Sequence, residues 1–499
     1  MSVKTHHSIP TDTCDLLVVG AGLAGLNALF AASRYLDREQ KVILVDRRAR
    51  IGGMWVDTYP YVRLHQPHPM FTAVNISWTL GQDPSYLPTK DEVLSHFDHC
   101  LAEISKLVTV EERYGWTFES DEPVPGGARV TCRTPHGDSR VIEARRLIKA
   151  YGTRVNPNPP LPLSSMRVRS VSPDTCDVRT GELAEDSAPV YIIGGGKTAM
   201  DTAHALVTTH PGREIHLIAG SGTLFARRDK FFPTGRRRWI GSTLLSSMAV
   251  DMCRRFDGTN EREVADWFGA TYGICLTPHT GNFLLGVLSQ EENSAIADGL
   301  AAVVMDHLVD VVDRDGAPRM LLRSGESLPV AEDSWIVNCT GYLATGDHPY
   351  EPYASADGTM LSVQTRSATM HLMSYMGYFM THLMYQGKLA DVPLYEMDLQ
   401  DMIRRHRAVL PYAMFTLVQY NLGLMADAMP AKVFRECGLD FDLWYPWPRR
   451  TAGAVRFMLT HRRERAHLRR TLGTVRERCD VRCGPLDFSD ATTYGAEAG

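Results

Sequence analysis

Short apolar runs alternate with glycine-rich turns and with segments of helical spacing along the first two thirds of the chain. The first run, at 15–19, leads into the turn 20–25, and apolar residues then recur at helical spacing from 26 to 35. A second apolar run, 41–45, ends on Asp46. Unbroken apolar runs of this length are typical of strands buried on both faces of a parallel sheet, whereas helical spacing indicates an amphipathic helix. The pattern predicts a strand–helix–strand unit.

The glycines of this first turn, Gly20-Ala21-Gly22-Leu23-Ala24-Gly25, have the spacing of a dinucleotide-binding loop. Gly20 permits a tight turn, Gly22 lets the backbone approach a pyrophosphate, and Gly25 lets helix and strand pack closely. The pyrophosphate would lie at the helix N-terminus, where free N–H groups favour negative charge. Asp46 would accept hydrogen bonds from a ribose. The alternative is a glycine-rich turn in an ordinary α/β domain, in which an acid at this position would be a coincidence. The expected contacts to this first dinucleotide are Gly20, Gly22, Leu23, Ala24, Gly25 and Asp46.

The same order of strand, glycine loop, helix and strand occurs a second time between residues 190 and 218. A strand at 190–193 precedes Gly194-Gly195-Gly196-Lys197-Thr198-Ala199, and the strand 214–218 follows the helix. That strand is followed by 219–221, which contains no acid, and this favours NADP over NAD because an acid there would select a free 2′-OH. Two arginines soon after would hold a 2′-phosphate through bidentate pairs, or would be solvated surface residues. The expected contacts to this second dinucleotide are Gly194, Gly196, Lys197, Thr198, Ala199, Arg227 and Arg228.

The remaining segments predict further strands and a helical second half. Period-two alternation predicts an antiparallel meander and a later hairpin, and aromatic residues mark a helical insertion. The expected elements are meander strands at 108–111, 128–132 and 139–144, a strand at 147–152, an insertion at about 230–285, a hairpin at 309–322, a buried strand at 335–338, and helices at 399–425 and 449–470.

Composition and charge narrow the function classes. The formal net charge of −5 does not predict nucleic-acid binding. No apolar run approaches transmembrane length, and residues 1–10 lack the core of a signal peptide, so we expect a cytoplasmic protein without membrane contact. The ten cysteines are thinly spread and predict reduced thiols, with no metal site. The eight arginines of 449–470 predict a solvated basic helix face or, alternatively, contact with an anionic partner or a membrane surface.

A loop downstream of the first unit carries candidate chemistry. Gly52-Gly53-Met54-Trp55 follows the ribose acid and allows close backbone approach to a long cofactor. The stretch 59–69 is polar and punctuated by prolines, and it has no strand or helix period, so it is predicted to be a loop beside the cofactor.

These motifs, in this order, resemble the class B flavin monooxygenases, the group that includes flavin-containing and Baeyer–Villiger monooxygenases. The resemblance covers residues 15–345. Besides the two glycine loops it rests on Gly52-Gly53-Met54-Trp55, on Ala150-Tyr151-Gly152 and on Cys339-Thr340-Gly341-Tyr342, which are similar to the family's hinge segments between its two nucleotide-binding domains. The resemblance implies FAD in the first site and NADPH in the second. It adds as cofactor contacts Arg47, Gly53, Met54, Trp55, Arg63, His65, Tyr151, Gly152, Thr340 and Gly341.

The chain departs from the family at two places. The FxGxxxH fingerprint expected before the second unit is missing, because 167–176 has neither the glycine nor the histidine. The loop position that carries an asparagine or aspartate near the flavin in the family is occupied here by His65. The catalytic candidates are therefore His65 and its neighbour Gln66, with His68 close by, while the alternative for His65 is a loop histidine bonded to backbone.

The expected fold class is α/β, with two Rossmann-like domains and a mainly helical C-terminal region. The first part of the FAD domain would span 1–186, the NADPH domain 187–330, and the FAD-domain return strand with a helical substrate region 331–499. The resemblance implies a monooxygenase that inserts one atom of O2 into an apolar or aromatic small molecule through a C4a-(hydro)peroxyflavin. A flavoprotein reductase, oxidase or desaturase without oxygen insertion is the alternative, and a non-catalytic dinucleotide-binding protein is the third. Met376 and Phe379 are candidate walls of an apolar substrate pocket.

Overall fold

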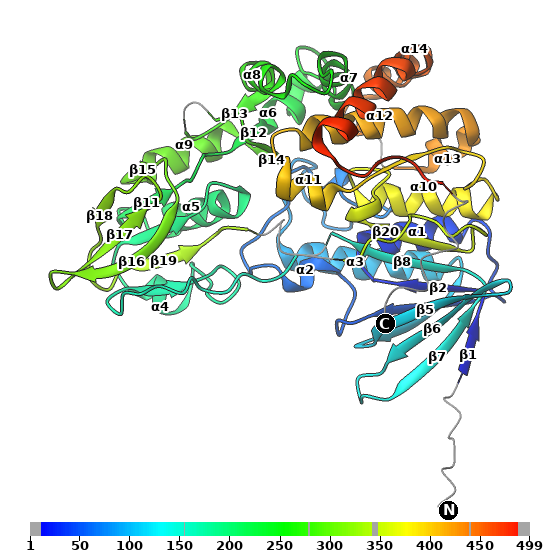
Figure 1. Ribbon diagram of the computed structural model, residues 1–499, viewed down its shortest axis with the longest axis horizontal. Helices are drawn as coiled ribbons and strands as arrows, with labels where there is room; N and C mark the ends of the chain where they lie inside the picture. The colour runs from blue at the N-terminus through cyan, green and yellow to red at the C-terminus, as the bar shows by residue number, and fades with distance from the viewer. Residues whose placement is uncertain (1–10, 154, 278–279, 342–347, 439–440, 488–499) are drawn as a thin grey trace, which may run out of the picture.

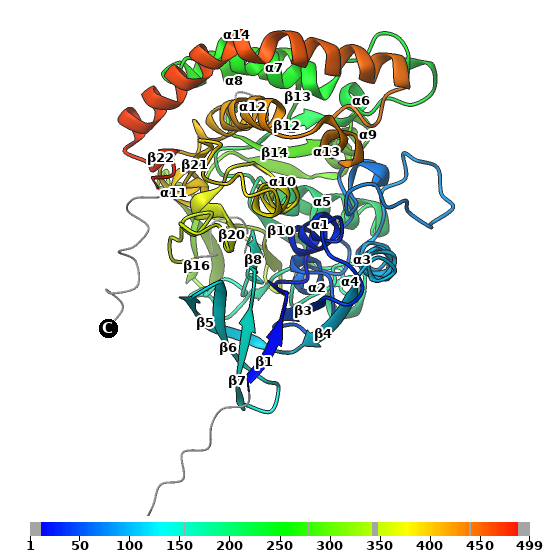
Figure 2. The ribbon, with the colours of Figure 1, turned by 90° about the vertical axis from the view of Figure 1, so that its right-hand side faces the viewer.

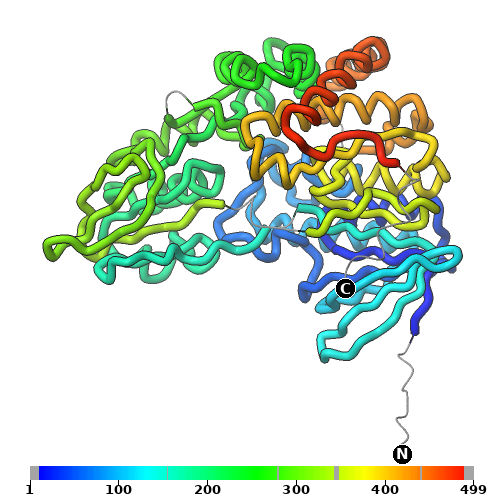
Figure 3. Tube along the Cα trace, in the orientation of Figure 1, coloured from blue at the N-terminus to red at the C-terminus, as the bar shows by residue number. Residues whose placement is uncertain are grey.

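The computed structural model describes residues 11–153, 155–277, 280–341, 348–438 and 441–487. Two lobes lie side by side in Figure 1, each built on its own parallel sheet, and a layer of helices covers one side of the assembly. The tube in Figure 3 shows the chain leaving the first lobe after β8 (Leu147–Gly152) and entering it again before β20 (Met360–Gln364). The second lobe is thus an insertion in the first.

The first lobe contains three layers. Its central sheet has the order β20-β8-β2-β3-β4 and is parallel throughout. Leu16 and Val18 of β2 face the core shared with the helices, whereas Leu17 and Val19 face a mixed outer sheet of order β1-β7-β6-β5 on the other side, in which only β1 and β7 pair in parallel. Side chains alternate along a strand, so an all-apolar strand is what a sheet covered on both faces requires. The elements are β2 (Leu16–Val19), β3 (Lys41–Asp46), β4 (Thr109–Tyr114), α1 (Leu23–Ala32), α3 (Lys90–Ser105), α10 (Met373–Tyr385), and the outer strands β1 (Thr11–Cys14), β5 (Thr117–Val124), β6 (Gly127–Arg133) and β7 (Ser139–Ala144).

The second lobe repeats this layering. Its parallel sheet has the order β15-β11-β10-β19-β9, with helices on one face and a three-stranded antiparallel sheet on the other. Both lobes therefore present helix N-termini at the carboxyl ends of parallel strands. The elements are β9 (Arg169–Val171), α4 (Gly181–Glu185), β10 (Val190–Ile193), α5 (Lys197–Thr209), β11 (Ile215–Ile218), α9 (Gln290–Gly299), β15 (Ala302–Val304), β16 (Leu308–Arg314), β17 (Ala317–Leu322), β18 (Ser327–Pro329) and β19 (Trp335–Asn338).

The other elements include the helical layer, a small mixed sheet of order β13-β12-β14, the strand pair β21-β22 and several short helices. Figure 2 shows the long helix α14 along the outer edge of this layer. The elements are α2 (Met54–Asp57), η1 (His68–Met70), β12 (Leu224–Arg227), α6 (Arg228–Phe231), η2 (Gly235–Arg238), α7 (Leu245–Arg255), α8 (Glu261–Tyr272), β13 (Gly273–Ile274), β14 (Phe283–Leu288), η4 (Thr365–Ser367), β21 (Tyr395–Met397), α11 (Leu399–Arg405), α12 (Leu410–Ala428), α13 (Ala431–Glu436), α14 (Trp447–Cys479) and β22 (Cys483–Pro485). Within the described ranges, no helix is both long and apolar enough to cross a bilayer.

The expected fold class is confirmed, with corrections to individual elements. The segment predicted as the first meander strand is β4, which instead lies parallel to β3 because the crossover helix α3 carries the chain back to that edge. The single helix predicted at 399–425 is two helices, α11 and α12. The break precedes Pro411, whose ring clashes with the preceding turn and confines proline to the first turn of a helix.

The order of strands can be compared with the expected division of the chain into segments 1–186, 187–330 and 331–499. The strand 335–338 pairs with β10 as β19, and β9 pairs with β19, so the second sheet extends beyond 187–330 at both ends. The strand that returns to the first sheet is β20. The expected helical insertion is present as α6, η2, α7 and α8, followed by strands β13 and β14.

Candidate functional site

The two glycine loops have the same relation to their neighbouring strand ends. Gly20 has a φ of +109°, and a Cβ built on it would lie 2.4 Å from the carbonyl oxygen of Ala150. Gly194 has a φ of +126°, and its Cβ would lie 2.8 Å from the carbonyl oxygen of Cys339. Only glycine is compatible with such a backbone conformation and such close approach. Each loop is thus wedged against one of the two segments that resemble the family's hinges, although Tyr342 of the second segment lies outside the described residues.

The helices that follow these loops begin without a side-chain cap. Gly22 is the N-cap of α1 and Gly196 that of α5, and neither helix has an acid in its first turn. By contrast, Thr89 and Ser289 cap α3 and α9 through complete capping boxes. The first N–H groups of a helix have no partner inside it, so an uncapped N-terminus favours an anion. Both loops therefore fit a dinucleotide pyrophosphate.

A second glycine pair faces the first loop. A Cβ on Gly22 would lie 3.3 Å from the Cα of Gly53, and a Cβ on Gly53 would lie 2.7 Å from the Cα of Gly22. Asp46 is buried, and its two carboxylate oxygens accept the backbone N–H groups of Ala21 at 2.7 Å and Arg48 at 2.8 Å. A carboxylate has further lone pairs, so Asp46 keeps the capacity to accept a ribose hydroxyl. These residues fit FAD because a side chain at either glycine would fill the cradle.

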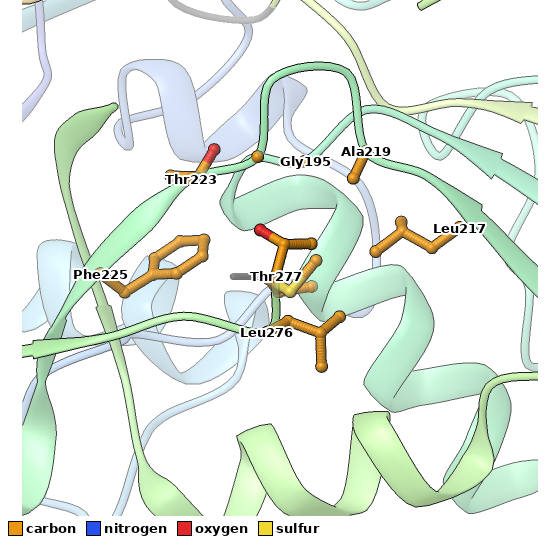
Figure 4. A pocket seen from close by; sticks show the side chains of 9 residues that line it. Gly195, Leu217, Ala219, Thr223, Phe225, Leu276 and Thr277 are labelled. Carbon is orange, nitrogen blue, oxygen red and sulfur yellow. The ribbon is translucent and has the colours of Figure 1, made fainter. Parts of the chain in front are cut away.

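The second loop opens onto free space at Gly196, where a built Cβ would meet no atom within 4 Å. Behind it, Gly195 abuts the carbonyl oxygen of Ala219, at 2.5 Å from a built Cβ. Figure 4 shows the small cavity between these residues and the side chains of Phe225 and Thr277. Its volume is about 10 Å³, so it holds a water at most and is not itself the dinucleotide site.

His65 lies where the two lobes meet. The half-buried imidazole is close to the cations Lys197 and Arg228 and to Glu292. Burial and then the two cations lower the pKa of His65 to about 3. Arg228 donates from Nε to the carbonyl oxygen of His65 at 2.8 Å and forms an ion pair with Glu292 at 2.8 Å. His65 is thus a neutral group that accepts or donates a hydrogen bond without carrying charge at neutral pH.

Glu292 and Lys197 complete this cluster. Burial raises the pKa of Glu292, but Lys197, Arg228 and the Ser289 N–H group more than offset it and lower that pKa to about 2. Lys197, at the first position of α5, forms an ion pair with Asp201 one turn later. A cation at a helix N-terminus opposes the helix dipole. Lys197 therefore supplies positive charge at the place where a bound dinucleotide would bring phosphate.

The loop that carries His65 is anchored in the second lobe. Tyr59 and Tyr61 are buried in the hydrophobic core of that lobe. The Tyr59 hydroxyl donates to Asp201 at 2.8 Å, and the Tyr61 hydroxyl shares a hydrogen bond of 2.8 Å with Thr202. We call residues 59–65 the docking loop. It ties the end of the first cofactor site to the helix α5 of the second.

Several other residues that were predicted to contact a cofactor form contacts with other parts of the chain. Arg63 is exposed and donates to the carbonyl oxygen of Leu87, away from Lys197 and Arg228. Arg227 is exposed and donates to the carbonyl oxygen of Gly273, whereas Arg228 is committed to the docking loop and Glu292. The Tyr151 side chain stacks on His348 at 4.9 Å and packs toward the outer sheet, and the residue that abuts Gly20 is its neighbour Ala150.

The remaining predicted contacts occupy the loops around these groups. Trp55 lies edge-on to Phe71 at 5.7 Å, and Thr340 donates to Asn338. Met54 and Gln66 are half-buried, Arg47 and Gly341 are exposed, and Gly152 has a φ of +65°. Met376 and Phe379, the candidate pocket walls, are buried in the core cluster where α10 packs on α1. These two residues do not line the cavity shown in Figure 4.

Sequence reasoning missed several members of the cluster. Glu292 closes the capping box of α9 with Ser289 and also pairs with Arg228, and only the first of these contacts has a local sequence signal. Asp201 has a local signal, because it follows Lys197 by one helical turn. Tyr59 and Tyr61 have none, since only the tertiary fold brings the loop to α5. All ten cysteines lie in the described part of the chain, and no disulfide joins any of them.

The fold and the paired loops define a protein with two dinucleotide-binding lobes of the kind found in flavin- and pyridine-nucleotide-dependent oxidoreductases. Residues 14–233, which contain both glycine loops, match the family of pyridine nucleotide-disulphide oxidoreductases. An uncharacterized protein of Mycobacterium tuberculosis (strain ATCC 25618 / H37Rv) is 30% identical over 212 residues, which are 40% of this chain and 36% of that protein. The chain thus spans little more than a third of the length of the curated relatives it matches.

Solved structures support the same fold. Cyclohexanone monooxygenase with bound epsilon-caprolactone is 13% identical, with a TM-score of 0.50 over 85% of this chain and 99% of that chain. A cyclohexanone monooxygenase variant from Rhodococcus sp. Phi1 bound to NADP+ is 14% identical, with a TM-score of 0.50 over 84% of this chain and 98% of that chain. At these identities the likeness concerns the fold, and in that respect the resemblance to class B flavin monooxygenases is confirmed.

Proposed function

We propose that the chain is an FAD-containing, NADPH-reduced monooxygenase that oxidises an apolar or aromatic small molecule with O2. The observation that carries this proposal is the docking loop, which places the end of the first glycine-loop site against the helix of the second. Two dinucleotides held in these loops would meet at that junction. When bound, FAD would accept a hydride from NADPH and activate O2, which is chemistry that no side chain supplies.

The residues of the chain would bind and orient these groups. Gly22, Gly53 and the N-terminus of α1 would hold the FAD pyrophosphate, and Asp46 would accept hydrogen bonds from its ribose. Gly196, Lys197 and the N-terminus of α5 would hold the pyrophosphate of NADPH. Arg227 is the more exposed of the two candidate arginines and would contact the 2′-phosphate, because the strand β11 ends without an acid.

His65 would act at the junction as a neutral hydrogen-bonding group. Its carbonyl oxygen is fixed by Arg228, so the backbone holds the position of the ring. A neutral imidazole donates one hydrogen bond and accepts another, and it would thereby orient oxygen at the flavin without adding charge. Gln66, next in the loop, would offer an amide to the same region.

The substrate would lie near a cluster of aromatic rings at the start of α10. His371, which is half-buried, lies 5.8 Å from Tyr375, 5.8 Å from Phe415 and 5.5 Å from Phe441, measured between ring centroids. Burial lowers the pKa of His371 to about 4, so its ring is neutral. Such rings favour apolar or aromatic substrates, with one polar atom to orient them.

The proposal is tested with the purified full chain. FAD should copurify, and NADPH should reduce it faster than NADH does. With a substrate found by screening apolar ketones, sulfides, amines and aromatic compounds under labelled O2, one labelled oxygen atom should appear in the product for each NADPH consumed. Colourless folded protein would contradict the proposal.

The second candidate function is a flavoprotein oxidoreductase without oxygen insertion. The observation that favours it is the missing fingerprint at 167–176 together with a histidine in place of the family's loop residue. Under labelled O2 such an enzyme would oxidise NADPH and form hydrogen peroxide or a reduced acceptor, with no label in any organic product.

A further inference from the structure

The long helix α14 has an unusual solvent face. Its first half exposes large apolar side chains, among them Trp447, Val455, Met458 and Leu459. Trp447 is 75% exposed and Leu459 is 69% exposed. The opposite face of the helix, including Leu468 and other residues further along, is buried against the rest of the molecule. Scattered exposed apolar residues are ordinary on a protein surface, but a group on one helix face marks an interaction site.

A second segment adds to this group. Trp239 and Ile240 follow η2, and Ile240 is 81% exposed. The segment lies beside the start of α14, because Arg449 donates to the carbonyl oxygen of Arg238 at 3.1 Å and to the Ser242 hydroxyl at 2.6 Å. We call these residues, together with the exposed residues of the first half of α14, the apolar ridge.

The second half of α14 is basic. An open groove of about 630 Å³ lies beside Tyr420, and it is lined by four arginines of α14, Arg462, Arg465, Arg469 and Arg470. The first two form ion pairs with Asp427, whereas Arg469 and Arg470 have no carboxylate partner among the described residues. The sequence has no Asp or Glu from 443 to 463, nor from 235 to 249. The apolar half of this face therefore carries no acid, and the acid beside the groove, Asp427, is already paired with Arg462 and Arg465.

We propose that this face of α14 docks onto an anionic phospholipid surface. The apolar ridge would insert among the lipids, and the arginines of the groove would bind headgroup phosphates. Apolar side chains with tryptophan at their edge, continuous with a cationic face, are the composition of helices that lie in a membrane interface. The charge of the face is complementary to anionic lipid and not to zwitterionic lipid alone.

The shape of the surface favours a lipid surface over a protein partner. The helix α14 follows the outer edge of the molecule in Figure 2, and it packs on α12 and α7. Its side chains are spread over about 18 Å of helix from Trp447 to Leu459. A bilayer accommodates separate protruding side chains, whereas a protein interface of stable size requires a contiguous complementary patch. The sequence alone does not predict this face, because only the fold brings residues 239–240 next to the first half of α14.

The test is co-sedimentation of the full-length holoprotein with vesicles. Vesicles of phosphatidylcholine alone should retain little protein, and vesicles that also contain phosphatidylglycerol should retain most of it at low salt. Binding should weaken as salt is added, and the tryptophan fluorescence of the wild type should shift to shorter wavelength on binding, by more than that of Trp447→Ser. Equal retention by the two kinds of vesicle, or by neither, would overturn the proposal.

Matched variants localise the contact. Trp447→Ser with Leu459→Ser should lower the partition coefficient more than about tenfold, and Arg469→Glu with Arg470→Glu should do the same. Met166→Ser replaces an apolar residue elsewhere that is more exposed still, at 91%, and should leave binding unchanged. All variants should keep the wild-type melting temperature and flavin content. If Met166→Ser weakens binding as much as the ridge variants, or if the chain binds an immobilised acidic polypeptide but no vesicle, the proposal fails.

Discussion

At the scale of single residues, His65 differs from an ordinary histidine in its pKa, which is lowered so far that the ring carries no charge at neutral pH. Burial and the neighbouring cations Lys197 and Arg228 lower its pKa to about 3. It therefore stays neutral at every pH at which the enzyme would be assayed. The lowered pKa is a consequence of this junction, because the histidine belongs to the first lobe, Lys197 to α5 of the second lobe and Arg228 to α6 of the helical layer.

We predict that His65 contributes no ionisation to the pH profile of NADPH oxidation between pH 5 and 8. His65→Gln keeps a neutral hydrogen-bonding side chain, so it should change the rate while leaving the apparent pKa values of the profile in place. His204→Gln, at a half-exposed position on α5, is the control. An ionisation near pH 6 to 7 that disappears in His65→Gln would show that the histidine titrates and would contradict this account.

Glu396 is a second buried group with an altered pKa. Burial raises its pKa from 4.5 to about 7, although the Tyr350 hydroxyl, which donates to it at 2.6 Å, and the nearby Arg482 act in the opposite direction. The folded state therefore binds a proton more tightly than the unfolded state does. The corresponding stability is complete below pH 4.5 and is lost as the pH rises through 7.

We predict that Glu396→Gln flattens this dependence of stability on pH. Between pH 4.5 and 8 the wild type should lose about 3 kcal/mol of unfolding free energy through this group, and the variant should lose almost none of it. Denaturant unfolding at several pH values measures the difference, with the exposed Glu39→Gln as a control. Parallel pH profiles for wild type and Glu396→Gln would count against a raised pKa at this site.

At the scale of elements, Gly194 and Gly196 of the second loop have separate tasks. Gly194 is required by the fold, since its φ is +126° and a Cβ would meet the carbonyl oxygen of Cys339. Gly196 is not required by the fold, because its φ is −83° and no atom lies within 4 Å of a built Cβ. Its lack of a side chain matters only when something occupies the space in front of α5.

A matched pair of alanine variants separates these tasks. Gly196→Ala should keep the wild-type melting temperature but raise the Kd for NADPH about tenfold or more, because its methyl group would occupy pyrophosphate space. Gly194→Ala should instead lower the unfolding free energy by about 1–3 kcal/mol. Thermal unfolding and NADPH titration measure both. Unchanged NADPH binding in a folded Gly196→Ala would mean that the pyrophosphate does not lie at this loop.

The sequence predicted most of these elements, and its failures have physical causes. Apolar runs and glycine spacing identified both strand–helix–strand units because every signal is local. The segment 108–111 was assigned to the wrong sheet because its pattern does not reveal which neighbour it pairs with. The cluster around His65 was only partly predicted. Its carboxylate, Glu292, lies far from the glycine loops in sequence, and the local pattern around it indicates only a helix cap.

At the scale of the whole molecule, the docking loop couples the two lobes. Tyr59 and Tyr61 are part of the second lobe's core although they belong to the chain of the first. The Tyr59 hydroxyl donates to Asp201, which also pairs with Lys197. Movement of the second lobe relative to the first must therefore carry the docking loop with it.

We predict that Tyr59→Phe loosens this coupling at small cost to the fold. Loss of a buried hydrogen bond should reduce the unfolding free energy by about 1 kcal/mol and leave Asp201 bonded only to Lys197. The KM for NADPH should rise because Lys197 is held less firmly, whereas flavin content should not change. Tyr35→Phe, in the first lobe away from α5, is the control. A change in flavin content with no change in KM would place the effect in the first site and contradict the coupling.

The central claim, that two dinucleotides meet at the docking loop and support oxygen transfer, is tested most directly by one stopped-flow experiment. The flavin is reduced with NADPH in the absence of air and then mixed with O2 while the full absorption spectrum is followed. The account predicts rapid bleaching by NADPH, then a lag with a distinct third spectrum and little hydrogen peroxide before oxidised flavin returns. Direct return of oxidised flavin with stoichiometric peroxide would contradict oxygen transfer, and absence of bleaching would contradict the meeting of the two sites.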